Sequence, residues 1–432
     1  MKDRLDYIKY TLKNGLTLVY LPMDVEFNTI DYTLPFGHLN NTGQFPGGTF
    51  HFLEHMCFHR SKLYPKKDSF EKFLASIGSK INAATSNNFT KYYLSVPSQE
   101  IEPALTGLLS HIFNPIIDEN DINIERGIIK NERRRLEAFF PGKNEIEKYE
   151  KSKWLFRSQS SLEQRLGSDT SLEKINKNIL EKALEYYKTK NSTIFIGGNC
   201  DIDRIISIFE NIDTKTIQNL EKVPAEKVYW VNKKFHKKYF SSTSRPSINI
   251  AGLSTYANHK ELFQLSLLAS YFTDNIYGVL HNWLRKDKGW TYETNTNVNF
   301  FDSQQVVVEI ILPIQDERHV DEILKIIKNK ITDSISDSSN FSKYIEKSLL
   351  GRVFLLQTLP DRKNTLLNTF LYQDTLEKET VYVDYTKEFL DTNYVKMFFE
   401  KKFKEFDFGV YVSVPKKKVL LKNFLAKIKR RL

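Results

Sequence analysis

The stretch His51-Phe52-Leu53-Glu54-His55 constrains this chain more than any other part of its sequence. Two histidines four positions apart on an α-helix lie one turn apart on the same face, so both imidazoles can bind one metal ion. Glu54 stands one residue before the second histidine, where a carboxylate can act as a base beside the metal. The stretch therefore predicts a zinc-binding helix that carries its own general base.

A catalytic zinc site needs a third protein ligand and an open position for water, so another element must contribute one side chain. Glu132 meets this need, because Glu125 and Glu132 are seven positions apart in a helical stretch and share one face. The gap between His55 and Glu132 is 76 residues. The order H-x-x-E-H, the inverse of H-E-x-x-H, is that of the inverzincin group of zinc enzymes.

The motif, the gap and the E-R-x-x-x-x-x-E pattern from Glu125 to Glu132 together resemble the pitrilysin family of zinc metallopeptidases. Within that family, the chain is most similar to the short branch related to mitochondrial processing peptidase. Met56 and Phe58 follow the motif as they commonly do there, and Asn82-Ala83-Ala84-Thr85 resembles the family's N-A-x-T strand. The resemblance covers nearly the whole chain.

This resemblance implies a role for each residue of the motif. His51, His55 and Glu132 would bind one zinc ion, Zn2+, per chain. Glu54 would be the general base, and Glu125 would be a carboxylate that supports the ligands. The family pattern places no ligand at His59, although positions 51, 55 and 59 follow a spacing that also suits a three-histidine site.

The resemblance also implies two places that contact substrate. The strand from Asn82 to Thr85 would be an exposed edge to which an extended peptide adds as a further strand, with Asn82, Ala83 and Thr85 as contact residues. The alternative is an ordinary hairpin with no role in binding.

The second place lies in the other half of the chain, where Leu284 to Tyr292 is similar to the family's L-R-x-x-x-G-L-x-Y segment. Trp290 stands there in place of the usual leucine. By this similarity, Arg285 and Tyr292 would contact the substrate backbone and stabilise the oxyanion.

The fold is expected to be α+β, with two homologous domains produced by duplication. The succession of paired strands and a helix that begins at Leu74 recurs from Leu284, which indicates an internal repeat. By resemblance, each domain is a mixed or antiparallel sheet packed with helices. We predict a catalytic zinc-binding domain over 1–213, a linker over 214–227 and a homologous domain over 228–432. The second half has no H-x-x-E-H, so we expect one metal site per chain.

Several local patterns predict individual elements. Asn14-Gly15 between two β-rich runs predicts a hairpin. The runs 80–85 and 89–96 predict two strands, and apolar periodicity predicts helices over 101–113 and 119–139.

Composition excludes several classes of protein. No run of eighteen apolar residues appears, and the acidic N-terminus is unlike a secretory or mitochondrial leader, so we expect a cytoplasmic protein. Cys57 and Cys200 are too few for a disulfide framework. The net charge of +10 is dispersed, and no nucleic-acid motif accompanies it.

The C-terminal stretch from Val419 to Ile428 combines an apolar stripe with many basic residues, a pattern typical of membrane-surface helices. Its place in the repeat favours packing on the second domain instead, and the membrane-surface alternative stays open.

These patterns predict a zinc-dependent endopeptidase that hydrolyses short or unstructured peptides, by resemblance inside an enclosed chamber. Peptide maturation is one such activity. The chain would act as a homodimer, or as a heterodimer with a metal-free homologue without which it is inactive. Two rival classes are a non-catalytic scaffold subunit and a zinc hydrolase that acts on small amides.

Overall fold

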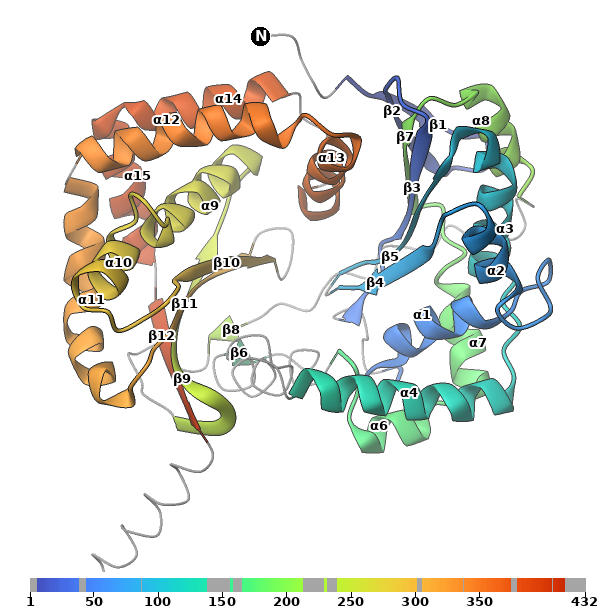
Figure 1. Ribbon diagram of the computed structural model, residues 1–432, viewed down its shortest axis with the longest axis horizontal. Coiled ribbons are helices and arrows are strands. Elements are labelled where there is room, and N and C mark those ends of the chain that lie inside the picture. The colour runs from blue at the N-terminus through green and yellow to red at the C-terminus, as the bar shows by residue number, and fades with distance from the viewer. Residues whose placement is uncertain are drawn as a thin grey trace, which may run out of the picture. The chain divides into compact units, whose positions relative to one another are not determined.

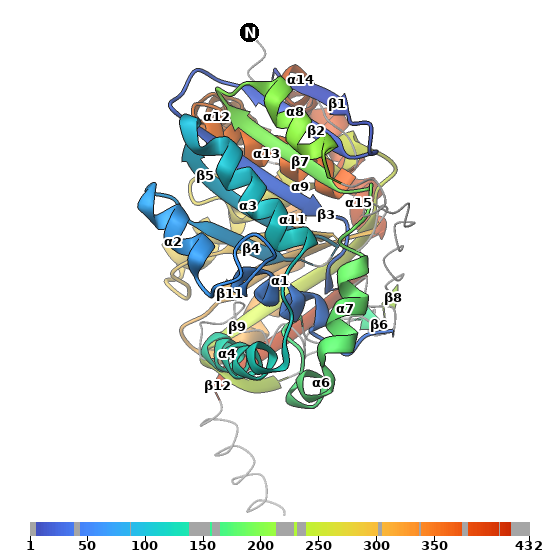
Figure 2. The ribbon, with the colours of Figure 1, turned by 90° about the vertical axis from the view of Figure 1, so that its right-hand side faces the viewer.

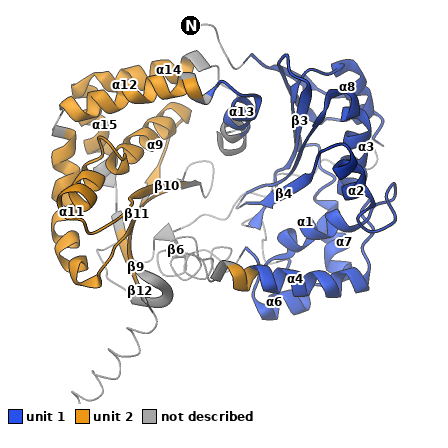
Figure 3. Cartoon of the chain, in the orientation of Figure 1, with its two compact units in different colours: residues 1–132, 163–226, 355–379 blue, residues 133–162, 227–354, 380–432 orange. Residues whose placement is uncertain are grey.

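The computed structural model describes residues 6–38, 44–86, 88–137, 156–157, 165–212, 229–230, 239–300, 305–336, 338–373, 379–405 and 407–415. The chain divides into two compact units (Figure 3). The first unit contains residues 1–132, 163–226 and 355–379, and the second contains residues 133–162, 227–354 and 380–432.

The first unit is built on a six-stranded sheet with the order β1-β2-β7-β3-β5-β4 (Figure 1). Its strands are β1 (Ile8–Thr11), β2 (Thr17–Pro22), β3 (Phe27–Leu34), β4 (Ile81–Thr85), β5 (Thr90–Pro97) and β7 (Thr193–Gly198). The β1–β2 hairpin confirms the prediction from Asn14-Gly15, and Gly15 adopts the positive φ of 87° that the turn requires. Only β2 and β7 pair in parallel among the described strands of this sheet.

Most helices of the first unit come from the first half of the chain. They are α1 (Thr49–His59), α2 (Ser69–Ser76), α3 (Ile101–Phe113), α4 (Glu119–Glu137), α6 (Asp169–Lys174), α7 (Lys177–Glu185) and α8 (Ile202–Glu210). Helix α3 runs across one face of the sheet, over β5 and its neighbours (Figure 2). Helix α1 packs against α3, α7 and β4, which brings its second turn beside the edge of the sheet.

A small residue allows two of these helices to approach closely. A Cβ atom on Gly107 of α3 would overlap the ring of Phe70 in α2, so a larger residue there would force this ring to move. Phe52, Leu53 and Met56 turn one side of α1 into the hydrophobic core. Close packing of this kind holds a helix in one orientation on the core.

The second face of the sheet carries α13 (Leu359–Gln373), which packs on β7. Leu359, Leu366 and Leu367 form a separate buried cluster with Val19, Leu21 and Phe195 of β2 and β7. This helix comes from the second half of the sequence but belongs to the first compact unit.

The second unit is built on a four-stranded antiparallel sheet with the order β10-β11-β9-β12. Its strands are β9 (Tyr239–Thr255), β10 (Asn295–Phe300), β11 (Gln305–Pro313) and β12 (Asp407–Pro415). A separate short pair joins β6 (Phe156–Arg157) to β8 (Tyr229–Trp230).

The helices of the second unit are α9 (His259–Thr273), α10 (Val279–His281), a π-helical turn (Asn282–Asp287), α11 (Val320–Ser336), α12 (Ser338–Leu355), α14 (Glu379–Lys387) and α15 (Thr392–Glu405). Asn258 caps α9 by accepting a hydrogen bond from the Glu261 N–H at 3.0 Å. No helix in the described part of the chain is long and apolar enough to cross a membrane.

The two sheets share one arrangement, which confirms the predicted duplicated α+β fold. The run β7-β3-β5-β4 of the first sheet corresponds strand by strand to β12-β9-β11-β10 of the second. The β1–β2 hairpin is an addition to the first sheet. The predicted linker 214–227 and the C-terminal stretch 419–428 lie outside the described residues.

Candidate metal centre

Helix α1 begins where a glycine lets two backbone segments meet. Gly48 caps the helix with a positive φ of 87°. A Cβ atom at this position would lie 2.8 Å from the backbone nitrogen of Gly167, so only glycine fits. This contact places the first turn of α1 beside the segment that carries Arg165.

The structure brings the three predicted ligands together. The Nε2 atoms of His51 and His55 lie 3.7 Å and 3.5 Å from the same Glu132 oxygen, Oε2. The ligand atoms of all three residues lie within 4.8 Å of one another. Among the described residues, no other group of three or more histidines, cysteines or acids comes together in this way.

The spacing of these atoms fits a zinc ion. In a tetrahedral site with metal–ligand distances of about 2.1 Å, neighbouring ligand atoms are about 3.4 Å apart. The separations of 3.5 Å and 3.7 Å are close to this value and too long for strong hydrogen bonds. Two imidazoles and one carboxylate are also the donor set of many catalytic zinc sites.

Burial favours the neutral form of His51, which is the form that binds a metal. Its side chain is almost fully buried, and burial lowers the pKa of His51 well below its usual value. A neutral imidazole carries the lone pair that a metal requires. Burial also lowers the pKa of His55, but its contacts with the carboxylates of Glu125 and Glu132 raise that pKa to about 9.

Glu54 is a buried carboxylate beside the cluster. Burial raises the pKa of Glu54 above its usual value, so the group holds a proton more readily than an exposed carboxylate does. The Thr85 hydroxyl donates a hydrogen bond to Glu54 Oε2 at 2.5 Å. The Thr85 side chain is buried and faces Glu54, and its backbone contact with an added substrate strand stays a prediction.

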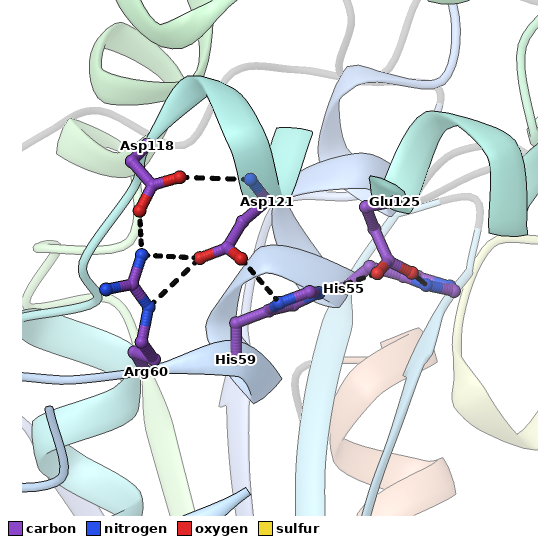
Figure 4. Close-up of polar contacts among 6 residues, drawn as sticks. All are labelled: His55, His59, Arg60, Asp118, Asp121 and Glu125. Carbon is purple, nitrogen blue, oxygen red and sulfur yellow. Dashed lines mark hydrogen bonds and ion pairs between the residues drawn. The ribbon is translucent and has the colours of Figure 1, made fainter. Parts of the chain in front are cut away.

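Glu125 lies behind the ligands and contacts two histidines (Figure 4). Its Oε1 atom lies 2.6 Å from His55 Nδ1, and its Oε2 atom lies 2.6 Å from His59 Nε2. Burial alone raises the pKa of Glu125, but these two hydrogen bonds lower it to about 2. His59 therefore contacts the supporting carboxylate and is absent from the metal-capable cluster found among the described residues.

The remaining predicted residues lie in two other places. Strand β4, with Asn82 and Ala83, is the edge of the first sheet and pairs with β5. Asn82 donates a hydrogen bond to the Tyr93 hydroxyl at 2.9 Å. In the second unit, the Arg285 guanidinium stacks 4.6 Å from the ring centre of Tyr292, whose side chain is 71% exposed. Their contact with substrate stays a prediction.

Sequence reasoning missed Arg165. Its guanidinium donates to the Thr85 carbonyl at 3.2 Å, and its charge adds to burial in lowering the pKa of His51. Nothing in the local sequence marks this arginine, because it reaches the site through tertiary packing, which includes the close approach of Gly48 to Gly167.

The order H-x-x-E-H, which α1 carries here, is that of the inverzincin class of zinc enzymes. Two family models match the chain: "Insulinase (Peptidase family M16)" over residues 26–147, and "Peptidase M16 inactive domain" over residues 177–344. The chain belongs to peptidase family M16, the pitrilysin family, as its sequence predicts.

Individual relatives agree with this assignment. A zinc protease of Rickettsia bellii is 28% identical over 307 residues, which are 70% of this chain and 72% of the relative. A protease from Helicobacter pylori has a similar fold, with a TM-score of 0.78 at 17% identity over 95% of this chain and 99% of that chain.

A second solved structure, described as a peptidase M16 inactive domain from Pseudomonas fluorescens, has a TM-score of 0.79 at 13% identity. The match covers 95% of this chain and 98% of the Pseudomonas fluorescens chain. Because such low identities show the fold alone, catalysis must be argued from the residues of this chain.

Proposed function

We propose that the chain is a zinc-dependent endopeptidase that hydrolyses short or unstructured peptides. The convergence of His51, His55 and Glu132, with the buried Glu54 beside them, carries this proposal. A scaffold subunit would have no need to keep a complete ligand set together with a positioned base.

Each residue of the site has a separate role in the proposed reaction. A zinc ion held by His51, His55 and Glu132 would polarise the scissile carbonyl and lower the pKa of a water molecule towards about 7. Glu54 accepts the proton of the attacking water and then gives it to the leaving amine. The Thr85 hydroxyl holds one oxygen of Glu54 in place during both transfers.

Peptide binding is proposed to use backbone contacts. An extended peptide added to β4 would form strand hydrogen bonds that ignore side-chain sequence. Such binding suits substrates without stable structure, because a folded chain cannot present a free strand. We assign Arg285 and Tyr292 to the substrate backbone and the oxyanion, as the family resemblance implies.

We further propose that the chain works in the cytoplasm as a homodimer. The alternative is a heterodimer whose second chain is a metal-free homologue required for activity. A solved structure described as a peptidase M16 inactive domain, which matches this chain over 98% of its own length, supports keeping this alternative.

The decisive experiment compares the wild type with Glu54→Gln on a mixture of unstructured peptides, read by mass spectrometry. The substitution keeps the size of the side chain, but an amide cannot accept a proton. We therefore expect a loss of about 100-fold to 10,000-fold in rate with zinc content unchanged. Zinc content is measured by atomic emission.

Each other outcome has a definite meaning. Cleavage by the variant at the wild-type rate would remove Glu54 from the mechanism. A zinc-loaded wild type that cuts no peptide alone, and cuts once a metal-free homologue is added, would establish the heterodimer. A wild type without zinc that cuts nothing would overturn the proposal.

A further inference from the structure

The carboxylate of Glu125, on α4, contacts two histidines of α1. His55 and His59 are four positions apart, so they lie on the same face of α1, and each contacts a different oxygen of Glu125 at 2.6 Å (Figure 4). Glu125 is 4% exposed and His59 is 8% exposed, so both lie almost completely outside the reach of water.

The hydrogen-bond pattern fixes the tautomer that a neutral His55 adopts. An ionised carboxylate only accepts hydrogen bonds, so His55 Nδ1 and His59 Nε2 must both donate to Glu125. Metal binding displaces the other ring proton from Nε2, which lies 3.5 Å from Glu132 Oε2, and the proton on Nδ1 stays. This is the tautomer that a metal ligand needs.

His59 in turn lies against a second group of charges. Its Nδ1 atom is 3.6 Å from Asp121 Oδ1. Asp121 Oδ2 accepts hydrogen bonds from Arg60 Nε at 3.0 Å and Nη2 at 2.6 Å, and Asp118 pairs with the same guanidinium. Arg60 is the C-cap residue of α1, and Asp121 lies in the first turn of α4.

This connected group ties the end of α1 to the start of α4, the two helices that carry the predicted ligands. Without His59, one oxygen of Glu125 would be buried and lose its donor, at a cost that favours rotation of the carboxylate. Rotation of Glu125 would release the hydrogen bond that orients His55. The consequence reaches the metal although His59 does not touch it.

We propose that His59 is a positioning residue that holds Glu125 and, through it, the metal ligand His55; this rests on the zinc site proposed above. Neighbours that hold a metal-bound histidine in place usually contribute about tenfold to a hundredfold to metal affinity. On this proposal His59 contributes to zinc affinity on that scale, although it is not itself a ligand.

The test measures zinc affinity of the full chain by competition with a chromogenic chelator. We expect His59→Leu, which has no donor, to bind zinc about tenfold to a hundredfold more weakly than the wild type. His59→Gln can place an amide N–H near the position of Nε2, so it should recover at least half of the lost affinity on a logarithmic scale. The absorption spectrum of the Co2+ form should change in His59→Leu and return towards the wild type in His59→Gln.

His111 offers a matched control. It is 2% exposed, lies in α3 and contacts the Cys57 carbonyl through Nδ1 at 2.7 Å, without a contact to Glu125. His111→Leu should lower thermal stability as His59→Leu does, and leave zinc affinity and the Co2+ spectrum unchanged.

Two results would overturn the inference while the proposed function stands: a His59→Leu variant that binds zinc within twofold of the wild type, or a His111→Leu variant that loses as much affinity as His59→Leu. A wild type that binds no zinc would overturn both, since the site itself would then be wrong.

Discussion

Thr85 and Glu54 form the shortest polar contact at the proposed base. Thr85 lies on β4, and Glu54 lies on α1, so the contact joins the edge of the sheet to the metal-binding helix. Glu54 is buried, and a buried carboxylate with a single side-chain donor depends strongly on that donor for its orientation.

We therefore expect Thr85→Val, which keeps the shape but removes the hydroxyl, to lower kcat about tenfold to a hundredfold. A hydrogen bond to a charged group contributes roughly 1.5–3 kcal/mol, and each 1.4 kcal/mol corresponds to about tenfold in rate. Steady-state kinetics on a defined peptide measure kcat and KM separately, and KM should change little.

Thr386 of α14 supplies the control. Its side chain is also buried and donates to the Tyr382 carbonyl at 2.8 Å. Thr386→Val should affect stability with little effect on kcat, and Thr85→Ser should restore most of the rate. Equal kcat values for Thr85→Val and the wild type would remove Thr85 from the positioning of the base.

The residue scale also shows where sequence reasoning succeeds. The approach of His51, His55 and Glu132 was predictable, because a histidine pair on one helical turn is a pattern of local geometry and the spacing to the glutamate resembles that of a known family. The contacts of Thr85 and His59 were not predictable, because each joins residues that approach only through the packing of α1 against β4 and α4.

At the scale of elements, α13 is attached to the first sheet by a buried ion pair. The Lys363 ammonium of α13 pairs with the Asp31 carboxylate in the middle of β3, with side chains 8% and 1% exposed. Lys91 of β5 approaches the same carboxylate at 4.0 Å. Local pattern predicts strand β5, but no sequence pattern shows which sheet α13 covers.

Removing one partner of this pair should be costly. We expect Lys363→Met to lower the free energy of unfolding by about 3–5 kcal/mol, because it leaves the Asp31 carboxylate buried without its main counter-charge. The double variant Asp31→Val with Lys363→Met should recover most of this loss, since a buried ion pair often has little net value over an apolar pair. Urea unfolding followed by far-ultraviolet circular dichroism measures both.

An exposed pair of the same charge types serves as the reference. Lys13 pairs with Glu210 at 2.9 Å, and the Lys13 side chain is 85% exposed. Lys13→Met should leave the urea midpoint unchanged, because exposed pairs contribute little. A double variant as unstable as Lys363→Met would mean that packing, and not the charge pair, holds α13.

At the scale of the whole molecule, the duplication was predictable because each half repeats the same succession of strands and helices. The composition of the compact units was not, because residues 133–162 and 355–379 each belong to the unit formed mainly by the other half of the chain. Such exchange depends on tertiary contacts between distant segments, and no sequence pattern records it.

The response of the whole chain to acid depends on which carboxylates the fold keeps ionised. Burial alone raises the pKa of Glu261 in the second unit, but the Ala257 N–H and the ammonium groups of Lys401 and Lys402 lower it to about 2. The carboxylate lies 2.7 Å from that N–H, 2.9 Å from Lys401 and 3.0 Å from Lys402. These contacts link the start of α9 to α15.

A lowered pKa in the folded state stabilises the fold above the ordinary pKa of about 4.5, and this contribution is lost as the pH falls from about 4.5 towards 2. We therefore expect Glu261→Gln to lower the thermal midpoint at pH 7 by several degrees, and the difference from the wild type to vanish near pH 2 to 3. Glu322→Gln, which changes an exposed carboxylate 3.7 Å from Lys288, should leave the midpoint unchanged at both pH values. A Glu261→Gln difference that stays constant across this range would show that the side-chain charge contributes nothing and that the amide disturbs packing alone.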